Sequence, residues 1–269
     1  YDSTRYGEPL WLRGNNRFRP DEPDVGNANV GRMQHSYTKR VRLFPARPFF
    51  VLPFLEVLFM KVLPQQLRLY AVTDRTWLNG RRLADVVAQA IDGGATFVQL
   101  REKCLDEHDL LAEAEELSAL CHFRHVPFVI DDNVEVALAA GADGVHVGQS
   151  DMAAKRARAL LGPDKILGVS AHSAAEALAA QADGADYLGC GAAFVTGTKL
   201  DAHPVTAETM RAVTAAVNIP VVAIGGIDAA NLLQLQGRGL AGVAVVSAIF
   251  AQADPCAASR ELYRLAGQL

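Results

Sequence analysis

The sequence predicts an α/β protein: a closed (β/α)8 TIM barrel preceded by an irregular N-terminal extension. Short apolar runs alternate regularly with helical patterns from residue 67 onward. Each run lacks polar alternation, which is typical of parallel strands buried on both faces. The composition also changes near residue 64, where Pro and aromatic residues give way to Ala, Gly and Val. Evenly spaced strand–helix units favour a closed barrel over the alternative, an open doubly wound sheet.

The first 66 residues differ from the rest of the chain. They hold 7 of the 12 prolines and 10 of the 19 aromatic residues, and their Lys and Arg outnumber Asp and Glu by 10 to 6. Residues 14–31 show neither the period of a strand nor that of a helix, which indicates loop or disorder. We therefore expect residues 1–66 to form an extension of low order and residues 67–269 to form the (β/α)8 barrel domain.

One apolar run inside the extension needs a separate interpretation. Phe49–Met60 has only 12 residues and contains Pro53 and Glu56, so it is too short and too interrupted to span a bilayer. Basic residues precede it as in a signal or transit peptide, but no small-residue cleavage site follows. The simplest interpretation is an upstream extension, with Met60 beginning the working protein. A targeting segment and an apolar patch packed on the barrel stay open as alternatives.

Eight strands and the helices between them follow from the apolar periodicity. The expected strands are Leu67–Thr73, Thr96–Arg101, Pro127–Asp131, Gly144–Val147, Ile166–Ser170, Tyr187–Cys190, Pro220–Ile224 and Gly242–Val246. The expected helices include Arg81–Asp92, Glu107–Cys121, Ser173–Ala182, Ala207–Ala216, Ala229–Gln236 and Cys256–Leu265. A further helical pattern between the third and fourth strands is broken by Gly141.

Composition narrows the class of protein. A net charge of −4 gives no support for a nucleic-acid partner. The four cysteines lie far apart without a CxxC pair, so reduced thiols in a cytoplasmic protein fit better than a zinc site or a disulfide framework. No membrane span is expected. A homo-oligomer stays open as the assembly.

Carboxylates and cations follow several of the expected strands. Asp132 follows the third strand and Asp151 the fourth, and the C-terminal ends of parallel strands share one face, so the two could hold one hard cation. Mg²⁺ bound by one or two carboxylates usually also contacts a substrate phosphate. Arg101, Lys103 and Lys199 come to the same face from the second and sixth strands. Together these residues suggest a site for a diphosphate with its Mg²⁺.

A second anion site is expected at the end of the barrel sequence. Gly225 and Gly226 follow the seventh strand, and a short helix follows the eighth, an arrangement that commonly binds phosphate in such barrels. A diphosphate site beside a monophosphate site suggests a transferase in which diphosphate leaves and a phosphorylated substrate attacks. No Ser/His/Asp or Cys/His arrangement stands out. His146 lies inside a strand and is interpreted as a core histidine.

Seven motifs in this order and spacing closely resemble thiamine-phosphate synthase: LYAVTD, FVQLREK, VGQSD, LGVSAH, TGTK, VVAIGGI and VVSAIF. The resemblance covers residues 67 to about 265. It implies a (β/α)8 barrel that joins 4-amino-2-methyl-5-hydroxymethylpyrimidine diphosphate to thiazole phosphate in thiamine diphosphate biosynthesis, releasing pyrophosphate. The implied cofactor is Mg²⁺, and the implied partners are these small-molecule substrates.

The resemblance also implies roles for individual residues. Asp132 and Asp151 would be the Mg²⁺ ligands. The residues expected to be catalytic are Arg101, Lys103, Ser170 and Lys199. The substrate-binding set is Gln99, Leu100, Arg101, Glu102, Lys103, Asp131, Ser170, Thr196, Gly197, Thr198, Lys199, Gly226, Val246 and Ser247, of which Thr196, Thr198, Gly226, Val246 and Ser247 would hold the thiazole phosphate.

One position departs from the family. Asp131 stands where the family usually has Asn, and an ionised Asp accepts hydrogen bonds without donating any. This change puts the pyrimidine contact at residue 131 in doubt. Two alternatives stay open: a thiazole tautomerase-like barrel, which need not keep the diphosphate residues, and a non-catalytic barrel that binds a phosphorylated ligand.

Overall fold

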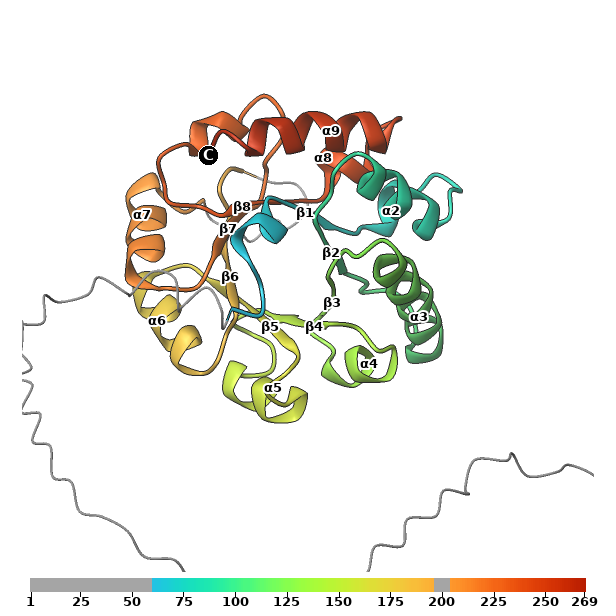
Figure 1. The fold of residues 1–269 in the computed structure, drawn as a ribbon, viewed down its shortest axis with the longest axis horizontal. Coiled ribbons are helices and arrows are strands. Elements are labelled where there is room, and N and C mark those ends of the chain that lie inside the picture. Colours follow the sequence, from blue (N-terminus) through green and yellow to red (C-terminus); the bar gives the residue numbers. More distant parts are fainter. Residues whose placement is uncertain (1–59, 196–203) are drawn as a thin grey trace, which may run out of the picture. The chain divides into compact units, whose positions relative to one another are not determined.

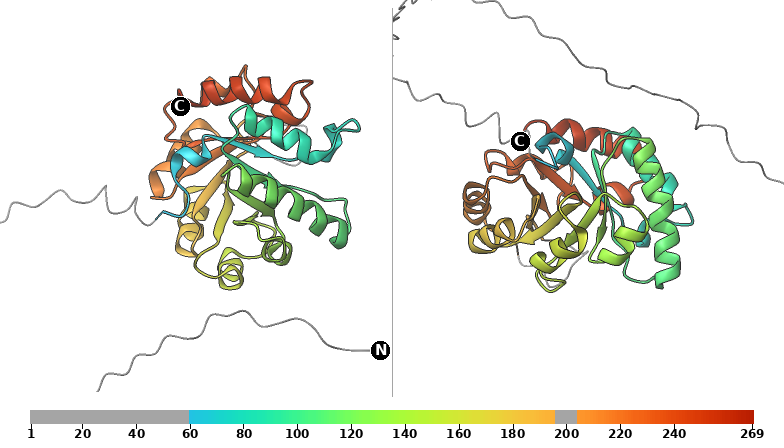
Figure 2. Two further views of the ribbon diagram at one scale, coloured as in Figure 1. Left: turned by 45° about the vertical axis from the view of Figure 1, so that its right-hand side comes forward. Right: turned by 60° about the horizontal axis from the view of Figure 1, so that its bottom comes forward.

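The computed structural model describes residues 60–195 and 204–269. The prediction for residues 1–59 lies outside this part of the chain. Eight parallel strands form a closed barrel in sequence order, and β1 pairs with β8 to close it. Helices surround the strands in Figure 1, and the two turned views in Figure 2 show the same ring from the side. The predicted (β/α)8 barrel is therefore confirmed.

The strands are β1 (Leu69–Val72), β2 (Phe97–Leu100), β3 (Phe128–Asp131), β4 (Gly144–Val147), β5 (Ile166–Ala171), β6 (Tyr187–Gly191), β7 (Val221–Ile224) and β8 (Gly242–Val245). The α-helices are α2 (Leu83–Asp92), α3 (Glu107–Phe123), α4 (Val134–Ala139), α5 (Ala154–Leu161), α6 (Ala174–Ala182), α7 (Ala207–Ala216), α8 (Ser247–Phe250) and α9 (Pro255–Ala266). Three short 3-10 helices complete the description: η1 (Pro64–Leu67), η2 (Arg75–Trp77) and η3 (Leu232–Leu235).

Two apolar layers hold the barrel together. Alternate strand residues face opposite sides of the sheet, and β1 shows the division: Tyr70 and Val72 belong to an inner cluster, whereas Leu69 and Ala71 belong to the larger cluster beneath the helices. Val62, before η1, is buried in the inner cluster. The part of the chain just before β1 therefore contributes to the barrel interior.

Polar side chains cap most of the α-helices in the described part of the chain. A capping side chain accepts a hydrogen bond from a backbone N–H in the first turn, which would otherwise lack a partner. The caps with this bond are Asp106 for α3, Asn133 for α4, Ser173 for α6, Thr206 for α7 and Asp254 for α9. Four of these caps mark where α3, α4, α6 and α7 begin after β2, β3, β5 and β6, and Asp254 marks where α9 begins after α8.

The prediction of a helix over Ala229–Gln236 is wrong. The structure has only the short η3 there. Asp228 accepts hydrogen bonds from the backbone N–H groups of Ala230 and Asn231, at 2.9 and 3.0 Å, and Asn231 Oδ1 accepts one from Asp228 N. Such local side-chain bonds compete with helical hydrogen bonds. The segment thus forms a turn before η3 begins.

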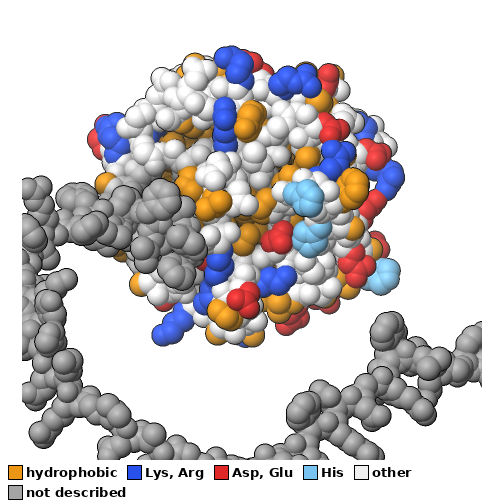
Figure 3. Space-filling view, viewed as in Figure 1, with side chains coloured by type: hydrophobic (Ala, Val, Ile, Leu, Met, Phe, Trp, Pro, Cys, Tyr) orange, Lys and Arg blue, Asp and Glu red, His pale blue; other side chains and the backbone are white. Residues whose placement is uncertain are grey.

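Charged side chains of both signs lie on the surface of the barrel domain (Figure 3). On the face shown in Figure 3, Lys and Arg side chains and Asp and Glu side chains both appear around the rim. Among the described residues, no helix combines the length and the apolar character needed to cross a membrane.

Candidate active site

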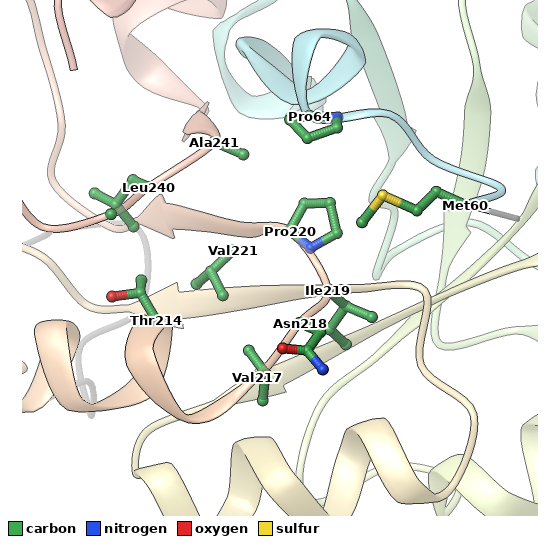
Figure 4. Close-up of a pocket in the computed structure, with 11 residues that line it drawn as sticks. Met60, Pro64, Thr214, Val217, Asn218, Ile219, Pro220, Val221, Leu240 and Ala241 are labelled. Carbon is green, nitrogen blue, oxygen red and sulfur yellow. The ribbon is translucent and has the colours of Figure 1, made fainter. Parts of the chain in front are cut away.

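The C-terminal strand ends gather most of the residues that the sequence singles out. Because all eight strands are parallel and form one closed barrel, their C-terminal ends lie at the same end of the molecule. Arg101 and Lys103 follow β2, Asp132 follows β3, and Asp151 follows β4. A hollow whose lining includes Met60, Pro64 and Pro220 lies at the opposite end of the barrel (Figure 4), because these residues precede β1 and β7.

Lys103 lies between two carboxylates. Its Nζ is 2.9 Å from Asp131 Oδ2 and also donates a hydrogen bond to Asp132 Oδ2. Arg101 Nε lies 3.7 Å from the same Asp131 oxygen. Burial opposes the charge on Lys103, but the hydrogen bonds to Asp132 and Asp131 outweigh it and raise the pKa of the ammonium above its ordinary value. A protonated cation therefore sits among the carboxylates at this strand end.

Asp131, Asp132 and Asp151 are together called the acidic group, and Asp151 is the member that follows β4. Its Oδ2 accepts a hydrogen bond from Gly148 N at 2.7 Å, which orients the carboxylate in the loop after β4. Burial raises the pKa of Asp151, and its side-chain contact with Asp132 raises the pKa further. A carboxyl group whose pKa rises beside another carboxylate is in a place that favours added positive charge. The two predicted Mg²⁺ ligands, Asp132 and Asp151, thus lie next to each other.

This donor set fits a divalent cation. Mg²⁺ prefers carboxylate oxygens and keeps several waters and substrate oxygens as its other ligands. Asp132 and Asp151 supply two carboxylates, and Asp132 has a left-handed backbone, φ 62°, that a short polar side chain tolerates. The backbone N–H of Asp132 donates a hydrogen bond to the backbone oxygen of His146 at 2.8 Å. The loop after β3 is therefore anchored to β4 directly beside the acidic group.

The unusual Asp131 has partners that suit its charge. Its side chain is only 12% exposed and accepts from Lys103, with Arg101 near the same oxygen. Two cations beside a mostly buried carboxylate compensate its charge where an Asn would need none. The structure thus shows how the chain accommodates Asp at this position.

A separate set of contacts holds the Glu102 carboxylate. Its carboxylate accepts from Arg75 Nε at 2.7 Å and from the backbone N–H groups of Lys103 and Cys104 at 2.8 and 2.9 Å. Burial acts against its ionisation, but the bonds from Arg75 and the two N–H groups lower its pKa overall. Arg75 also donates to both carboxylate oxygens of Glu113 on α3. This clamp fixes the loop that carries Lys103.

Apart from Gln99 and Ser170, the remaining members of the substrate-binding set divide into three groups. The Leu100 side chain is buried in the core between sheet and helices, so any substrate contact there would come from its backbone. Gly226, Val246 and Ser247 lie at the ends of β7 and β8, where the phosphate site is expected. The predicted residues Thr196, Gly197, Thr198 and Lys199 lie outside the described part of the chain.

Gly226 has a packing reason to be glycine. Its φ is +68°, a left-handed conformation that other residues rarely adopt. An added Cβ would lie 2.5 Å from Val195 O and 2.9 Å from Phe194 O. Gly225, with φ +97°, accepts a hydrogen bond from Phe194 N at 3.0 Å. The loop after β6 and the loop after β7 can therefore approach each other only because glycine stands at 226.

Sequence reasoning missed a set of polar residues inside the barrel. Tyr70, Tyr187 and His146 are buried, as predicted for His146, but they form a hydrogen-bonded series that joins Gln99 to Ser170. A sequence signal for it existed. Gly168 lies opposite Tyr187 in the strand register, and a Cβ there would be 2.5 Å from His146 Nδ1. Glycine inside a strand often marks such a close approach.

Comparison with known proteins agrees with this geometry. A family model described as thiamine monophosphate synthase matches residues 69–249. The thiamine-phosphate synthase of Ruminiclostridium cellulolyticum is 48% identical over 73% of this chain and 94% of its own length. That of Chloroflexus aurantiacus is 50% identical over 74% of this chain and 92% of its own. Among solved structures, thiamine phosphate pyrophosphorylase from Pyrococcus furiosus superposes with a TM-score of 0.71 at 37% identity, covering 77% of this chain and 98% of that one.

Proposed function

The chain belongs to the thiamine monophosphate synthase family, and we propose that it performs that family's reaction with the residues at the C-terminal ends of its strands. The reaction joins a hydroxymethylpyrimidine diphosphate to thiazole phosphate, which makes the protein a transferase that forms thiamine phosphate and releases pyrophosphate. The single observation that carries the assignment of the site is the placement of Lys103 among Asp131, Asp132 and Asp151.

The chemistry needs charge stabilisation more than a nucleophile from the protein. The electron-rich aminopyrimidine can stabilise a cation at its exocyclic methylene, so the C–O bond to the diphosphate can break first. The thiazole nitrogen then donates its electron pair to that methylene. We propose that Arg101, Lys103 and Lys199 neutralise the departing diphosphate, in the way that preorganised charges stabilise transition states generally.

Asp132 and Asp151 are the proposed Mg²⁺ ligands. Bound there, the ion would supply positive charge against the diphosphate oxygens. The ammonium of Lys103 already lies among these carboxylates, which supports the proposal that the group accepts a cation. Asp131 stays paired with Arg101 and Lys103 and sets the position of the two basic side chains.

The second substrate is proposed to bind at the ends of β7 and β8. The first N–H groups of α8, beginning at Ser247, have no partner within the helix, and Gly226 brings its loop close to the loop after β6. These features support a phosphate site at Gly226, Val246 and Ser247. Thr196, Gly197 and Thr198 are proposed to join it from the loop after β6.

Two variants test these assignments. Asp132→Ala and Lys199→Ala are both expected to lose turnover and keep the barrel, because they remove charge from the site without opening the core. Thiamine phosphate formation is measured with both substrates and Mg²⁺, and circular dichroism checks the fold. Arg264→Ala is the matched control, since Arg264 pairs with Glu261 on the outer face of α9. Turnover unchanged in either site variant would contradict the assignment.

A thiazole tautomerase and a non-catalytic binder would not need residues that bind a diphosphate. Neither requires a group of carboxylates and cations for a diphosphate, yet Arg101, Lys103, Asp132 and Asp151 converge here. Either alternative would bind thiazole phosphate without forming thiamine phosphate in the presence of Mg²⁺. The same assay therefore separates the synthase from both alternatives.

The cellular location, the domain boundaries and the assembly are also proposals. We place the enzyme in the cytoplasm, with residues 67–269 as the catalytic domain, a division that the family match over residues 69–249 supports. A homo-oligomer is the proposed assembly, and sedimentation of the full chain measures it.

A further inference from the structure

A continuous series of hydrogen bonds crosses the barrel interior. Gln99 Nε2 on β2 donates to Tyr70 OH on β1 at 2.9 Å, and Tyr70 OH lies 2.8 Å from Tyr187 OH on β6. Tyr187 OH lies 3.0 Å from His146 Nδ1 on β4, and His146 Nε2 lies 3.0 Å from Ser170 Oγ on β5. The series therefore begins and ends at two residues expected to contact the pyrimidine diphosphate, and its three inner members have no assigned role.

The chemistry of the groups sets the direction of every hydrogen bond. Tyr70 OH accepts a hydrogen bond from the Gln99 amide, so its own single hydroxyl hydrogen is available to donate to Tyr187 OH. Tyr187 OH accepts that hydrogen bond and donates one of its own to His146 Nδ1. A neutral imidazole that accepts at Nδ1 carries its proton on Nε2, and that proton is donated to Ser170 Oγ. The Ser170 hydroxyl proton is then free to point toward substrate.

Packing holds the series in place. The rings of Tyr70, Phe97 and Tyr187 meet edge to face, with centroids 4.6 to 5.9 Å apart, and Gly168 leaves the space that Tyr187 and His146 fill. Gln99 is 4% exposed and Tyr187 is fully buried. Neither Gln99 nor Tyr187 can rotate its side chain away without leaving a buried polar group unpaired.

We propose that Tyr70, Tyr187 and His146 are positioning residues that hold the Gln99 amide and turn Ser170 into a hydrogen-bond donor for the pyrimidine diphosphate. This inference rests on the proposed function for the identity of the substrate. It assigns a part in substrate recognition to three side chains that would otherwise count as polar residues of the core.

The tyrosine hydroxyls agree with this direction. Burial raises the pKa of Tyr70 and of Tyr187, so both hydroxyls keep the hydrogens that they donate along the series.

The first test reads the tautomer of His146 and needs no activity. The full chain is labelled with ¹⁵N-histidine, and the His146→Gln variant identifies the His146 signals among those of the seven histidines. The expected spectrum shows a protonated Nε2 and a bare Nδ1 at pH 7. A protonated Nδ1, or an imidazolium, would overturn the proposed direction.

The second test measures the effect on substrate. Tyr187→Phe removes one hydroxyl and is expected to raise KM for the pyrimidine diphosphate on the order of tenfold, with KM for thiazole phosphate unchanged. Tyr263→Phe is the control, because its ring stacks under Arg68 outside the series. The double variant Tyr187→Phe/Ser170→Ala should lose less than the product of the two single losses, since both changes act on the same donor. Equal KM changes for both substrates, or fully multiplicative losses, would contradict a positioning role.

The two tests also separate this inference from the proposed function. The predicted tautomer in a protein without thiamine phosphate formation would refute the function and leave the orientation of the series intact. Normal Mg²⁺-dependent turnover with the opposite tautomer would refute the inference alone.

Discussion

Replacing His146 by Gln is expected to remove a pH-dependent part of the free energy of unfolding. In the folded chain burial lowers the pKa of His146 from 6.5 to about 4, whereas in the unfolded chain the imidazole takes up a proton near its ordinary value. Between these two pKa values the unfolded chain therefore binds more protons than the folded one. The contribution of neutral His146 is fully present above pH 6.5 and is lost as the pH falls toward 4.

The magnitude follows from the two pKa values. A difference of about 2.5 units corresponds to about 3 kcal/mol once both forms are protonated. Between about pH 8 and about pH 5, the same linkage relation gives a loss of about 2 kcal/mol. The imidazole is buried on all sides, so solvent screening reduces this figure little.

Urea unfolding at both pH values, followed by circular dichroism, measures the effect. The wild-type chain should lose about 2 kcal/mol more than His146→Gln on going to the lower pH, because all other titrating groups are common to both. His108→Gln is the control, since that side chain is exposed on α3, and it should follow the wild type. Equal pH dependence in wild type and His146→Gln would show that His146 is not held neutral by burial in the folded chain.

Two further variants test the loops that hold the site. In Arg75→Lys, a single ammonium nitrogen replaces the two guanidinium nitrogens that donate to Glu102 and to Glu113, so the clamp is lost. KM for the pyrimidine diphosphate, measured by steady-state kinetics, should rise several-fold while KM for thiazole phosphate stays constant. An unchanged KM would show that Lys103 needs no such clamp. Gly226→Ala adds a Cβ 2.5 Å from Val195 O at φ +68°, and should instead raise KM for thiazole phosphate; a change confined to the pyrimidine substrate would place the phosphate elsewhere.

Much of the fold could be predicted because its signals are local. Strands buried on both faces are continuous apolar runs, and helices begin at side chains such as Asp106 and Ser173 that cap them. The ends of the predicted strands lie within two residues of the observed ends: Leu67–Thr73, for example, was expected where Leu69–Val72 is observed, and Gly144–Val147 matches at both ends. The helix expected over 229–236 failed because Asp228 and Asn231 bond to each other's backbone, which helical periodicity does not reveal.

The site was predictable only in part. Parallel strands end on one face, so grouping Asp132 and Asp151 needed topology alone. The position of Lys103 between Asp131 and Asp132 depends on loop conformation, and the clamp from Arg75 depends on residues 27 and 38 positions away. The contact of Tyr70 with Tyr187 spans 117 residues. No periodicity encodes which buried polar groups meet across a barrel, which is why the interior series came from the structure.

Thiamine phosphate formation by the full chain is the measurement to make on the proposed site. Both substrates are supplied with Mg²⁺, and the assay is repeated with a chelator and with Lys103→Ala. We expect product with Mg²⁺, none with the chelator, and a large loss in Lys103→Ala at unchanged fold. Product formation that ignores both the chelator and the loss of Lys103 would contradict the proposed site.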